Sequence, residues 1–466
     1  MNYREALSWL YSLQRFGIKL GLENTRRLLD ECCSGVGKPG RCSASVTGVK
    51  RPTTAAASAS TPKVIHVAGT NGKGSVCAMI DSICRAQGYR TGLFTSPHLV
   101  TFRERIRVNG EMISQRAVAD GLTTIRNLVA NWDPHPTFFE VTTALALKHF
   151  SDPLGRGAKP DSEQLPSLSP DRDKLDVVIL ETGIGGRLDA TNAIQSDVSV
   201  ITQIDFDHEE WLGNTLAEIA TEKAGIIKPR IPVVAAAQRP EAEKVIRARA
   251  ADCEAPLQFI NESYDCSPIA LRGDHQKQNA ALAIAAIHAA KLGIHDRAIA
   301  LGLVSMDWPA RFQKWHERTI IDGAHNPAAA RMLAETWREA FGDQKATLIL
   351  AILSDKDLRG ICEALVPIAD SVFLPRIQSE RATSPEELAK ILTSIPGFCR
   401  AGASAAGNPE SVRGCPTISI TRSVAEALAL ARLKPNPILV TGSLHFAGEV
   451  LADLRGEPAA FEECAQ

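Results

Sequence analysis

The sequence lacks an excess of charge of either sign. Its 52 lysines and arginines nearly balance its 53 aspartates and glutamates, which gives a formal net charge of −1. A chain without a basic surplus offers no electrostatic reason to bind nucleic acid or an anionic membrane. We therefore expect neither of them as a partner.

Long apolar runs and paired cysteines are also missing. No segment approaches the roughly 20 uninterrupted apolar residues of a membrane-spanning helix, and residues 1–5 mix charges where a secretion signal has an apolar stretch. The 11 cysteines contain no C-x-x-C, and an odd, scattered set suits free thiols better than a disulfide framework. The pattern indicates neither a zinc site nor a nucleophilic cysteine, and a reducing cytoplasm is the expected location.

The length and composition are those of a chain with more than one domain. At 466 residues, of which 44% are apolar, it exceeds a typical single domain and can fill buried cores. We predict two α/β domains: a P-loop-type parallel-sheet ATPase domain over residues 1–305 and a smaller Rossmann-like domain over residues 306–466. Strand candidates alternate with helix candidates in both, which predicts parallel sheets covered on both faces.

Apolar periodicity places the expected elements. Helices are expected at residues 3–14, 21–30, 75–88, 120–131, 139–150, 215–227, 241–251 and 275–292. Strands are expected at residues 64–68, 91–95, 176–181, 198–204, 233–236, 319–321, 347–352, 371–374, 417–420 and 438–441. Residues 31–62 are rich in Ser, Ala, Gly, Thr and Pro, and we predict a flexible insertion because they bury too little surface to offset the entropy of ordering. Residues 151–175 and 400–416 are expected as surface loops.

The stretch at residues 64–75 carries the most informative motif. An apolar, β-branched run is followed by G-T-N-G-K-G-S and then by a helix-compatible segment. This arrangement cradles phosphate, because glycines let backbone N–H groups converge on an anion and Lys73 adds a full positive charge. Ser75 is placed to offer a hydroxyl to magnesium. A generic glycine turn is the alternative, and Gly74 departs from the common G-x-x-x-x-G-K-[ST] spacing.

Two more groups stand at the carboxyl ends of expected strands, where open α/β sheets bind ligands. Glu181 ends an apolar strand and is followed by glycines, so its carboxylate is a candidate for holding the magnesium that bridges nucleotide phosphates. A helix-capping or solvated acid is the alternative. His208 follows the next strand among several acids and is a candidate for a second metal position, although a lone histidine is more often an ordinary residue.

Three residues carry no signal of their own. Lys223 is by default a solvated lysine on an amphipathic helix. Arg311 and Asp322 each follow or end an apolar segment near the expected domain boundary. For these two, contact with a ligand and a plain salt bridge are equally compatible with the spacing.

Together these pieces resemble the folylpolyglutamate synthases and the bifunctional dihydrofolate synthase/folylpolyglutamate synthases. These are Mur ligase superfamily enzymes, which use ATP to join a carboxylate to an amine. The resemblance covers nearly the whole chain, except for the insertion and the two surface loops. Its motifs are the phosphate loop, T-S-P-H-L at 95–99, E-T-G-I-G-G-R-L-D-A-T-N at 181–192, D-H with L-G at 207–213, E-K-A-G-I-I-K at 222–228, G-D-H-Q at 273–276, W-P-A-R-F at 308–312 and D-G-A-H-N-P at 322–327.

The resemblance implies a role for each matched residue. The ATP-binding positions are Asn71, Gly72, Lys73, Gly74, Ser75, Asn279, Arg311 and Asp322. Ser96 and Glu181 would bind one magnesium ion and His208 a second. Lys223 matches a lysine that the family carbamylates into a carboxylate-like metal ligand, so the candidate catalytic residues are Lys73, Lys223 and His208. The positions for the pterin-containing substrate are Lys19, Leu20, Gly21, Leu22, Thr137, Phe138, Phe139, Glu140, Leu188, Asp189 and Ala190.

The implied reaction joins L-glutamate to a folate or to dihydropteroate. Transfer of the γ-phosphoryl group of ATP turns the carboxylate into an acyl phosphate, which the amine of glutamate then attacks. Lys73 and two cations would neutralise the transferred charge, and closure of the domains would bring Arg311 and Asp322 over the nucleotide. We expect a monomer. The alternatives are an amide ligase for a cell-wall peptide precursor and a nucleotide-dependent regulatory ATPase.

Overall fold

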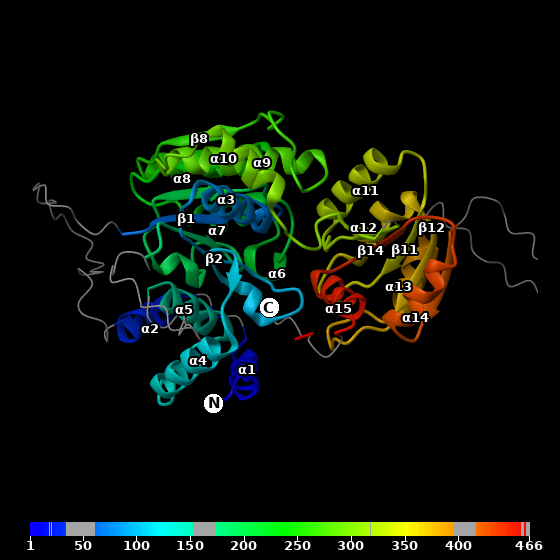
Figure 1. Cartoon of the computed structure of the whole chain (residues 1–466), viewed down its shortest axis with the longest axis horizontal. Helices are drawn as coiled ribbons and strands as arrows, with labels where there is room; N and C mark the ends of the chain where they lie inside the picture. The colour runs from blue at the N-terminus through cyan, green and yellow to red at the C-terminus, as the bar shows by residue number, and fades with distance from the viewer. Residues whose placement is uncertain are drawn as a thin grey trace, which may run out of the picture.

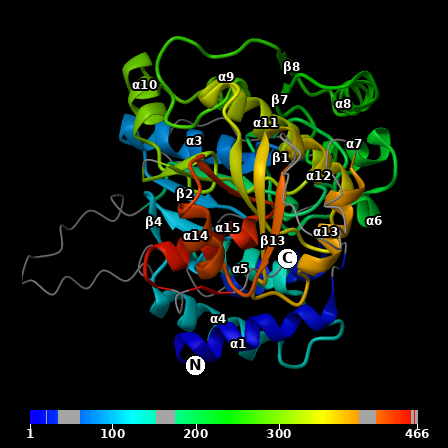
Figure 2. The ribbon, with the colours of Figure 1, turned by 90° about the vertical axis from the view of Figure 1, so that its right-hand side faces the viewer.

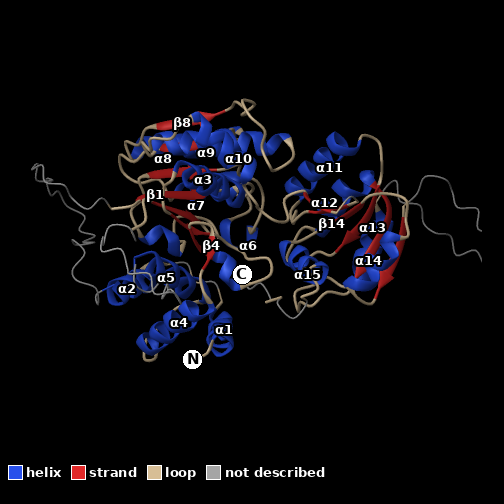
Figure 3. Ribbon diagram, viewed as in Figure 1, coloured by secondary structure: helices blue, strands red, loops and turns tan. Residues whose placement is uncertain are grey.

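The computed structural model describes residues 1–17, 19, 21–33, 61–151, 174–316, 318–395, 416–457 and 461–462. Helices and strands form two bodies, each built on a central sheet with helices around it (Figures 1 and 3). None of the helices in these ranges combines the length and apolarity that crossing a membrane requires. The expected insertion at 31–62 and the expected loops at 151–175 and 400–416 lie almost entirely outside the described residues.

The first body contains an eight-stranded sheet. In chain order its strands are β1 (Lys63–Ala68), β2 (Thr91–Phe94), β3 (Ile106–Val108), β4 (Glu111–Met112), β5 (Val177–Glu181), β6 (Val198–Ile201), β7 (Val233–Ala236) and β8 (Leu257–Ile260). Their order across the sheet is β4-β3-β2-β5-β1-β6-β7-β8. The neighbours from β2 to β8 pair in parallel, which confirms the predicted parallel sheet. The antiparallel edge made by β3 and β4 is an addition to that prediction.

Helices cover both faces of this sheet, as predicted. One face packs against α3 (Lys73–Gln87), α9 (Asp274–Ala289) and α10 (Asp296–Ser305). The other packs against α1 (Tyr3–Ser12), α4 (Gln115–Val129) and α5 (Phe138–Ser151), beside α2 (Glu23–Cys33) and the short helix η1 (Leu13–Phe16). Successive residues of β5 alternate between these two cores: Val177 and Ile179 face α3, and Val178 and Leu180 face α5. A third core lies under α7 (Leu216–Ala224) and α8 (Pro240–Asp252).

The second body contains a six-stranded sheet. Its strands are β9 (Gln313–Trp315), β10 (Thr319–Ile321), β11 (Ala346–Leu350), β12 (Ala369–Pro375), β13 (Thr417–Thr421) and β14 (Ile438–Thr441). The order across the sheet is β13-β12-β11-β14-β10-β9, parallel except for the edge strand β9. One face is covered by α11 (Pro327–Phe341), α12 (Leu358–Leu365), the short helix η5 (Val366–Ile368) and α13 (Pro385–Ser394). The other is covered by α14 (Val424–Arg432) and α15 (Leu444–Leu454).

The expected helices are confirmed, with shifts at their ends. The helix expected from residue 120 begins at Gln115, because the side chain of Ser114 accepts a hydrogen bond from the backbone N–H of Ala117. The helix expected to reach residue 227 ends at Ala224. The helix α10, the strands β8 and β9 and the one-turn helix α6 (Glu209–Leu212) were not expected.

The carboxyl ends of the parallel strands in the first sheet point toward the second body. In the view turned by 90°, the second body lies in front of the first, with β13 and α14 toward the viewer (Figure 2). The parallel strands β1, β5 and β6 end beside one another, because β1 lies between the other two. The loops that follow these three strands therefore meet, and they carry the candidate site.

Candidate active site

The glycine-rich stretch forms a tight loop between β1 and α3, as predicted. Gly69 has a φ of +148°, and a Cβ atom there would lie 1.9 Å from Thr202 Oγ1, so only glycine fits. Gly72, with a φ of +92°, is the N-cap of α3, and Lys73 is the first residue of the helix. Lys73 Nζ donates to the carbonyl oxygens of Gly69 and Thr70 at 3.1 and 3.3 Å. The loop thus places a helix N-terminus and an ammonium group side by side, which suits an anion.

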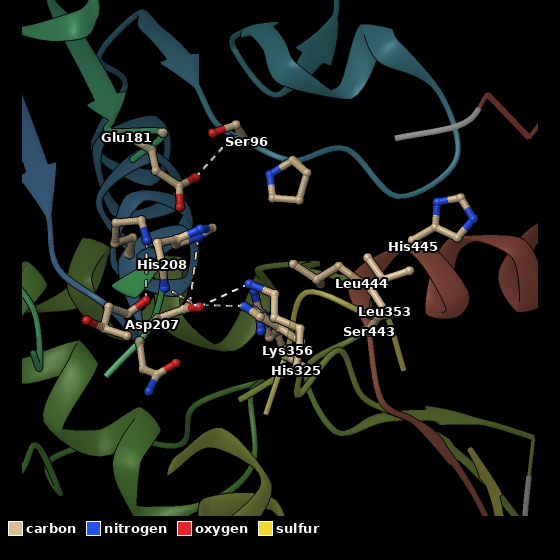
Figure 4. A pocket seen from close by; sticks show the side chains of 18 of the residues that line it. Ser96, Glu181, Asp207, His208, His325, Leu353, Lys356, Ser443, Leu444 and His445 are labelled. Atoms are coloured by element: carbon tan, nitrogen blue, oxygen red, sulfur yellow. Dashed lines mark hydrogen bonds and ion pairs between the residues drawn. The ribbon is translucent and has the colours of Figure 1, made fainter. Parts of the chain in front are cut away.

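A cavity opens in front of this loop, between the two bodies (Figure 4). It holds about 860 Å³ of space, part of it open to solvent. The first body contributes the residues Thr70, Asn71, Gly72, Lys73, Gly74, Ser96, Pro97, Glu181, Gly183, Asp207 and His208. The part of the chain from residue 311 onward contributes the residues Arg311, His325, Leu353, Lys356, Arg381, Ser443, Leu444 and His445. The predicted phosphate and metal residues therefore share one cavity with Lys356, Arg381 and His445 of the second body, which we call the basic wall.

Ser96 and Glu181 lie together on the wall of this cavity (Figure 4). The backbone N–H of Ser96 donates to Glu181 Oε2 at 3.1 Å. Burial raises the pKa of Glu181, against the opposing charge of Lys73 and this hydrogen bond. Ser96 Oγ is buried and has no hydrogen-bond partner among the described residues. A buried hydroxyl without a partner next to a buried carboxylate fits a hard cation, which would satisfy both oxygens.

Asp207 and His208 follow β6 and face two side chains of the second body. Lys356 Nζ lies 3.0 Å from Asp207 Oδ1, and His325 Nε2 lies 3.8 Å from Asp207 Oδ2. Burial alone would raise the pKa of Asp207, but the adjacent side chains of His208, His325 and Lys356 hold it well below its usual range. This ionised carboxylate therefore joins the two bodies across the cavity.

His208 is held in an unusual backbone conformation. Its φ of +52° lies in the left-handed region, which a histidine rarely adopts. Burial lowers its pKa to about 3, although Asp207 opposes that shift. The imidazole is therefore neutral near pH 7, and a neutral imidazole is the form that binds metal ions.

Lys223 is buried behind the phosphate loop and does not line the cavity itself. Its Nζ donates to the carbonyl oxygen of Gly69 at 2.8 Å, and its side chain comes from α7. Burial, helped by the charge of Lys73, lowers its pKa to about 7. The default expectation of a solvated lysine is thus wrong: this amine is buried and is largely neutral in mildly alkaline solution.

Six predicted nucleotide residues line a neighbouring cavity: Asn71, Gly72, Ser75, Asn279, Arg311 and Asp322. Asn279 touches the loop closely, because a Cβ atom on Gly72 would lie 2.6 Å from its Oδ1. Arg311 Nε is buried without a hydrogen-bond partner among the described residues. Asp322 accepts from the backbone N–H groups of Phe312 and Ala324 at 2.7 and 2.8 Å. Ser75 therefore lines the same cavity as Asn279, Arg311 and Asp322.

The three segments predicted for the pterin-containing substrate come together in the first body. The helix α5, which starts at Phe138, packs on η1 and on the short helix η4 (Ala190–Ala193). The Lys19 ammonium lies 5.3 Å from the ring centre of Phe16, which stacks on His135 at 4.9 Å. These contacts join the segment before α2, the start of α5 and the start of η4. Leu20 lies outside the described residues.

Individual residues of these segments are buried and internally bonded. Glu140 accepts from the backbone N–H of Thr137 at 2.8 Å, and burial raises its pKa, against that bond and the charge of Lys19. Asp189 accepts from the backbone N–H of Gly183 at 2.9 Å. Gly21, Leu22 and Leu188 lie in the same region, with Leu22 buried.

The substrate region adjoins the cavity through Gly183. A Cβ atom on Gly183 would lie 2.6 Å from the Phe139 ring, and Gly183 itself lines the cavity.

The basic wall from the second body was missed in the sequence. Lys356 and Arg381 follow β11 and β12, and His445 lies in the first turn of α15. The charged run D-K-D at 355–357, directly after an apolar strand, was a usable signal for Lys356. Arg381 and His445 have no local pattern that marks them.

The described side chains would hold a metal ion only together with oxygen atoms from a substrate or water. Within the described ranges, no group of three or more His, Cys, Asp or Glu side chains could hold a metal ion on its own. Magnesium commonly takes one or two carboxylates and completes its shell with phosphate oxygens and water. The pair of Ser96 and Glu181 beside a phosphate loop fits that pattern.

Comparisons with known proteins agree with this geometry. The family model described as Mur ligase, glutamate ligase domain matches residues 310–444. The dihydrofolate synthase/folylpolyglutamate synthase of Bacillus subtilis is 33% identical over 419 residues, which cover 83% of this chain and 88% of that protein.

Two solved structures cover almost the whole chain. Escherichia coli FolC in complex with DHPP and ADP superimposes with a TM-score of 0.73 and 30% identity, covering 97% of this chain and 98% of that chain. The bifunctional folylpolyglutamate synthase/dihydrofolate synthase of Yersinia pestis, solved with AMPPNP and a Mn ion, gives a TM-score of 0.75 and 29% identity over 98% of both chains. With this likeness along its whole length and a phosphate loop, an acid and a basic wall around one cavity, the chain belongs to the folylpolyglutamate synthase/dihydrofolate synthase family of the Mur ligases.

Proposed function

We propose that this protein uses ATP to join L-glutamate to the carboxylate of a folate, and also to that of dihydropteroate. The observation that carries the proposal is the single cavity in which the phosphate loop, Ser96 with Glu181, and the basic side chains of the second body face one another. The names and bound ligands of the relatives support the same assignment.

ATP would lie with its phosphates on the loop between β1 and α3. Asn71, Gly72, Lys73 and Gly74 surround the phosphate position, and Ser75, Asn279, Arg311 and Asp322 line the adjoining cavity for the rest of the nucleotide. Ser96 and Glu181 would hold one divalent cation, and His208 a second. When bound, such cations neutralise negative charge on the phosphate oxygens.

Lys223 is proposed to be carbamylated. Carbamylation needs the neutral amine, and a lysine with a pKa near 7 is about half neutral at pH 7, against roughly one molecule in 3,000 at the ordinary value. The product carries a carboxylate-like group, whose negative charge the positive charge of Lys73 would stabilise. This modification would place an anionic group behind the phosphate loop.

The chemistry follows from the poor reactivity of a carboxylate. Attack of a carboxylate oxygen on the γ-phosphorus of ATP releases ADP and forms an acyl phosphate. The amine of glutamate then attacks the acyl carbon, the C–O bond to phosphate breaks, and hydrogen phosphate leaves with the proton that the amine loses. The N-terminus of α3 and Lys73 stabilise charge on the transferred group, and positioning between the two bodies supplies much of the remaining rate.

The basic wall of the second body is proposed to bind the carboxylates of glutamate. Lys356 and Arg381 line the cavity from loops that follow parallel strands, where such sheets bind ligands. Lys356 already bridges to Asp207 of the first body. Glutamate would therefore bind at the junction, close to the acyl phosphate.

Replacing Lys356 by methionine should raise the KM for glutamate about tenfold, because one charge-assisted hydrogen bond to a carboxylate is lost. The KM for ATP should change less than threefold. Steady-state kinetics with each substrate varied in turn measures both values. Lys390→Met, at an exposed position on α13, is the matched control and should change neither. An equal rise in both KM values would show that Lys356 acts on the whole site and would remove its assignment to glutamate.

The function itself is tested by glutamate-dependent release of ADP, with dihydropteroate and tetrahydrofolate in separate reactions and products identified by mass. We expect ligated product with both acceptors. Product with tetrahydrofolate alone would confine the enzyme to chain extension. ADP release that ignores glutamate, without ligated product, would overturn the ligase assignment in favour of a regulatory ATPase.

We also propose that the two domains divide near residue 306 and that the protein is a monomer. The last strand of the first sheet ends at Ile260 and α10 ends at Ser305, whereas the second sheet begins at Gln313. Nucleotide and substrates would bind at this junction, so closure of the domains would exclude water from the acyl phosphate.

A further inference from the structure

The last described residues of the chain, Phe461 and Glu462, lie between the two bodies, where Figure 1 draws them as a short red segment. Phe461 contacts His445, which lines the cavity, and Glu462 contacts the loop that follows Ser96. Neither residue has a place in the chemistry proposed above.

The carboxylate of Glu462 gathers three donors from the first body. The Tyr3 hydroxyl donates to Oε1 at 3.0 Å, the Thr101 hydroxyl to Oε2 at 3.1 Å, and the backbone N–H of Phe102 to Oε2 at 2.6 Å. Tyr3 begins α1, and Phe102 begins the short helix η2 (Phe102–Arg105). One side chain at the end of the chain thus fixes two distant segments.

The backbone of Glu462 adds two hydrogen bonds to the same loop. Its N–H donates to the carbonyl oxygen of Val100 at 2.8 Å, and its own carbonyl oxygen lies 3.0 Å from His98 Nε2. Because a carbonyl oxygen only accepts, His98 must donate from Nε2. Arg105 Nε donates to His98 Nδ1 at 2.9 Å, which requires the same tautomer. Glu462 therefore fixes the side chain of His98, which lies two positions after Ser96 in the sequence.

The loop held in this way is pressed against the second body. A Cβ atom on Gly448 of α15 would lie 1.9 Å from the carbonyl oxygen of Leu99, so the glycine permits a direct backbone contact. The Phe461 ring meets His445 edge to face, with 5.1 Å between the ring centres. His445 lines the cavity on the side of the second body, and Ser96 on the side of the first.

We propose that Phe461 and Glu462 form a strap that positions the Ser96 loop against α15, so that Glu462 is a positioning residue for the metal site. This inference rests on the proposed function, because it takes Ser96 and Glu181 as the place of the cation. Without the strap, Ser96 keeps its hydrogen bond to Glu181, but the loop that follows Ser96 loses four hydrogen bonds to Glu462. Tyr3 of α1 also loses its hydrogen bond to the Glu462 carboxylate. The expected consequence is weaker binding of the cation.

The test measures Mn²⁺ binding to the protein in the presence of ADP. The electron paramagnetic resonance signal of free Mn²⁺ reports how much of the ion remains unbound. Glu462→Ala should weaken Mn²⁺ binding about tenfold, the scale of effects seen when a group that orients a metal ligand is removed. Its affinity for the folate substrate should stay within twofold, and its thermal midpoint within a few degrees of the unmodified protein. Glu457→Ala, at an exposed glutamate after α15, is the control and should bind Mn²⁺ normally.

Mn²⁺ binding by Glu462→Ala equal to that of the unmodified protein would overturn the strap. If this variant fails to fold, Glu462→Gln keeps the side-chain volume and should show a smaller loss of Mn²⁺ affinity in the same assay; unchanged affinity there would also overturn it. The measurement does not depend on ligation, so an unmodified protein that binds Mn²⁺ with ADP but makes no glutamyl product would refute the proposed function and leave the strap standing. An unmodified protein that binds no Mn²⁺ would refute both.

Discussion

Replacing Lys73 by methionine should lower turnover about 10³-fold. Lys73 is the first residue of α3 and presents its ammonium group beside the helix N-terminus, where the γ-phosphoryl group would be transferred. Removing one preorganised donor from a transition-state charge costs about 10²–10³ in rate, and Lys73 also carries a full charge. Single-turnover formation of ADP is the appropriate measurement, because it reports the phosphoryl transfer directly.

The control for Lys73 is Lys63→Met, in the strand that leads into the same loop. Lys63 forms an exposed ion pair with Asp197 at 2.9 Å, and such pairs contribute about 0–1 kcal/mol. We expect Lys63→Met to keep normal turnover. Loss of the Lys73 bonds to Gly69 and Thr70 should cost about 1 kcal/mol each, so the thermal midpoint shows whether the variant is folded. Turnover by Lys73→Met above a tenth of normal would remove the lysine from the transfer step.

Replacing Lys223 by alanine should lower turnover about 10²-fold or more, with partial recovery when a short carboxylate such as acetate or propionate is added. The carbamylated side chain would supply an anionic group behind the loop, and deletion leaves a buried space that a small carboxylate can enter. Loss of a group that supports a metal site commonly costs 10–100-fold. Turnover against carboxylate concentration, with the mass of the intact protein in bicarbonate, measures both parts.

Lys228→Ala is the matched control for Lys223. Lys228 is also partly buried, and burial lowers its pKa to about 8, but its Nζ bonds to Asn192 and does not line the cavity. We expect Lys228→Ala to lose some stability and to gain nothing from added carboxylates. If Lys223→Ala keeps normal turnover, or if carboxylates restore both variants equally, the proposed carbamate has no role.

The elements at the centre of each sheet could be predicted because their patterns are local. The strand β1, the glycine turn and α3 follow one another within a short stretch, so residue type and spacing specify all three. Buried parallel strands such as β5 are continuous apolar runs, which the sequence displays directly. The acid at the end of β5 was placed by the same local logic.

The edges of the sheets were harder to predict. The hairpin of β3 and β4 turns at Asn109 and Gly110, with φ angles of +52° and +83°, and Asn-Gly is the usual signal for such a turn. The sequence therefore contains a local signal for this hairpin. The strand β9 has only three residues and pairs at an edge, where a short segment carries too little periodicity to be recognised.

The contact between the basic wall and the first body could not be predicted, because the approach of the two bodies decides it. Lys356 meets Asp207 across 149 residues of sequence, and no local pattern relates the two. The same holds for the tail, where Glu462 bonds to Tyr3 at the other end of the chain. Burial likewise decides the protonation state of Lys223, whereas the spacing in the sequence predicts a solvent-exposed lysine.

The central claim, activation of a carboxylate as an acyl phosphate in this cavity, is tested most directly with substrate labelled by ¹⁸O in the carboxylate that receives glutamate. An acyl phosphate keeps a labelled oxygen between carbon and phosphorus, and attack of the amine expels it with the phosphate. We therefore expect one ¹⁸O atom in each inorganic phosphate formed during ligation, detected by mass spectrometry or by the shift of its ³¹P signal. Phosphate without label, formed together with ligated product, would contradict the account.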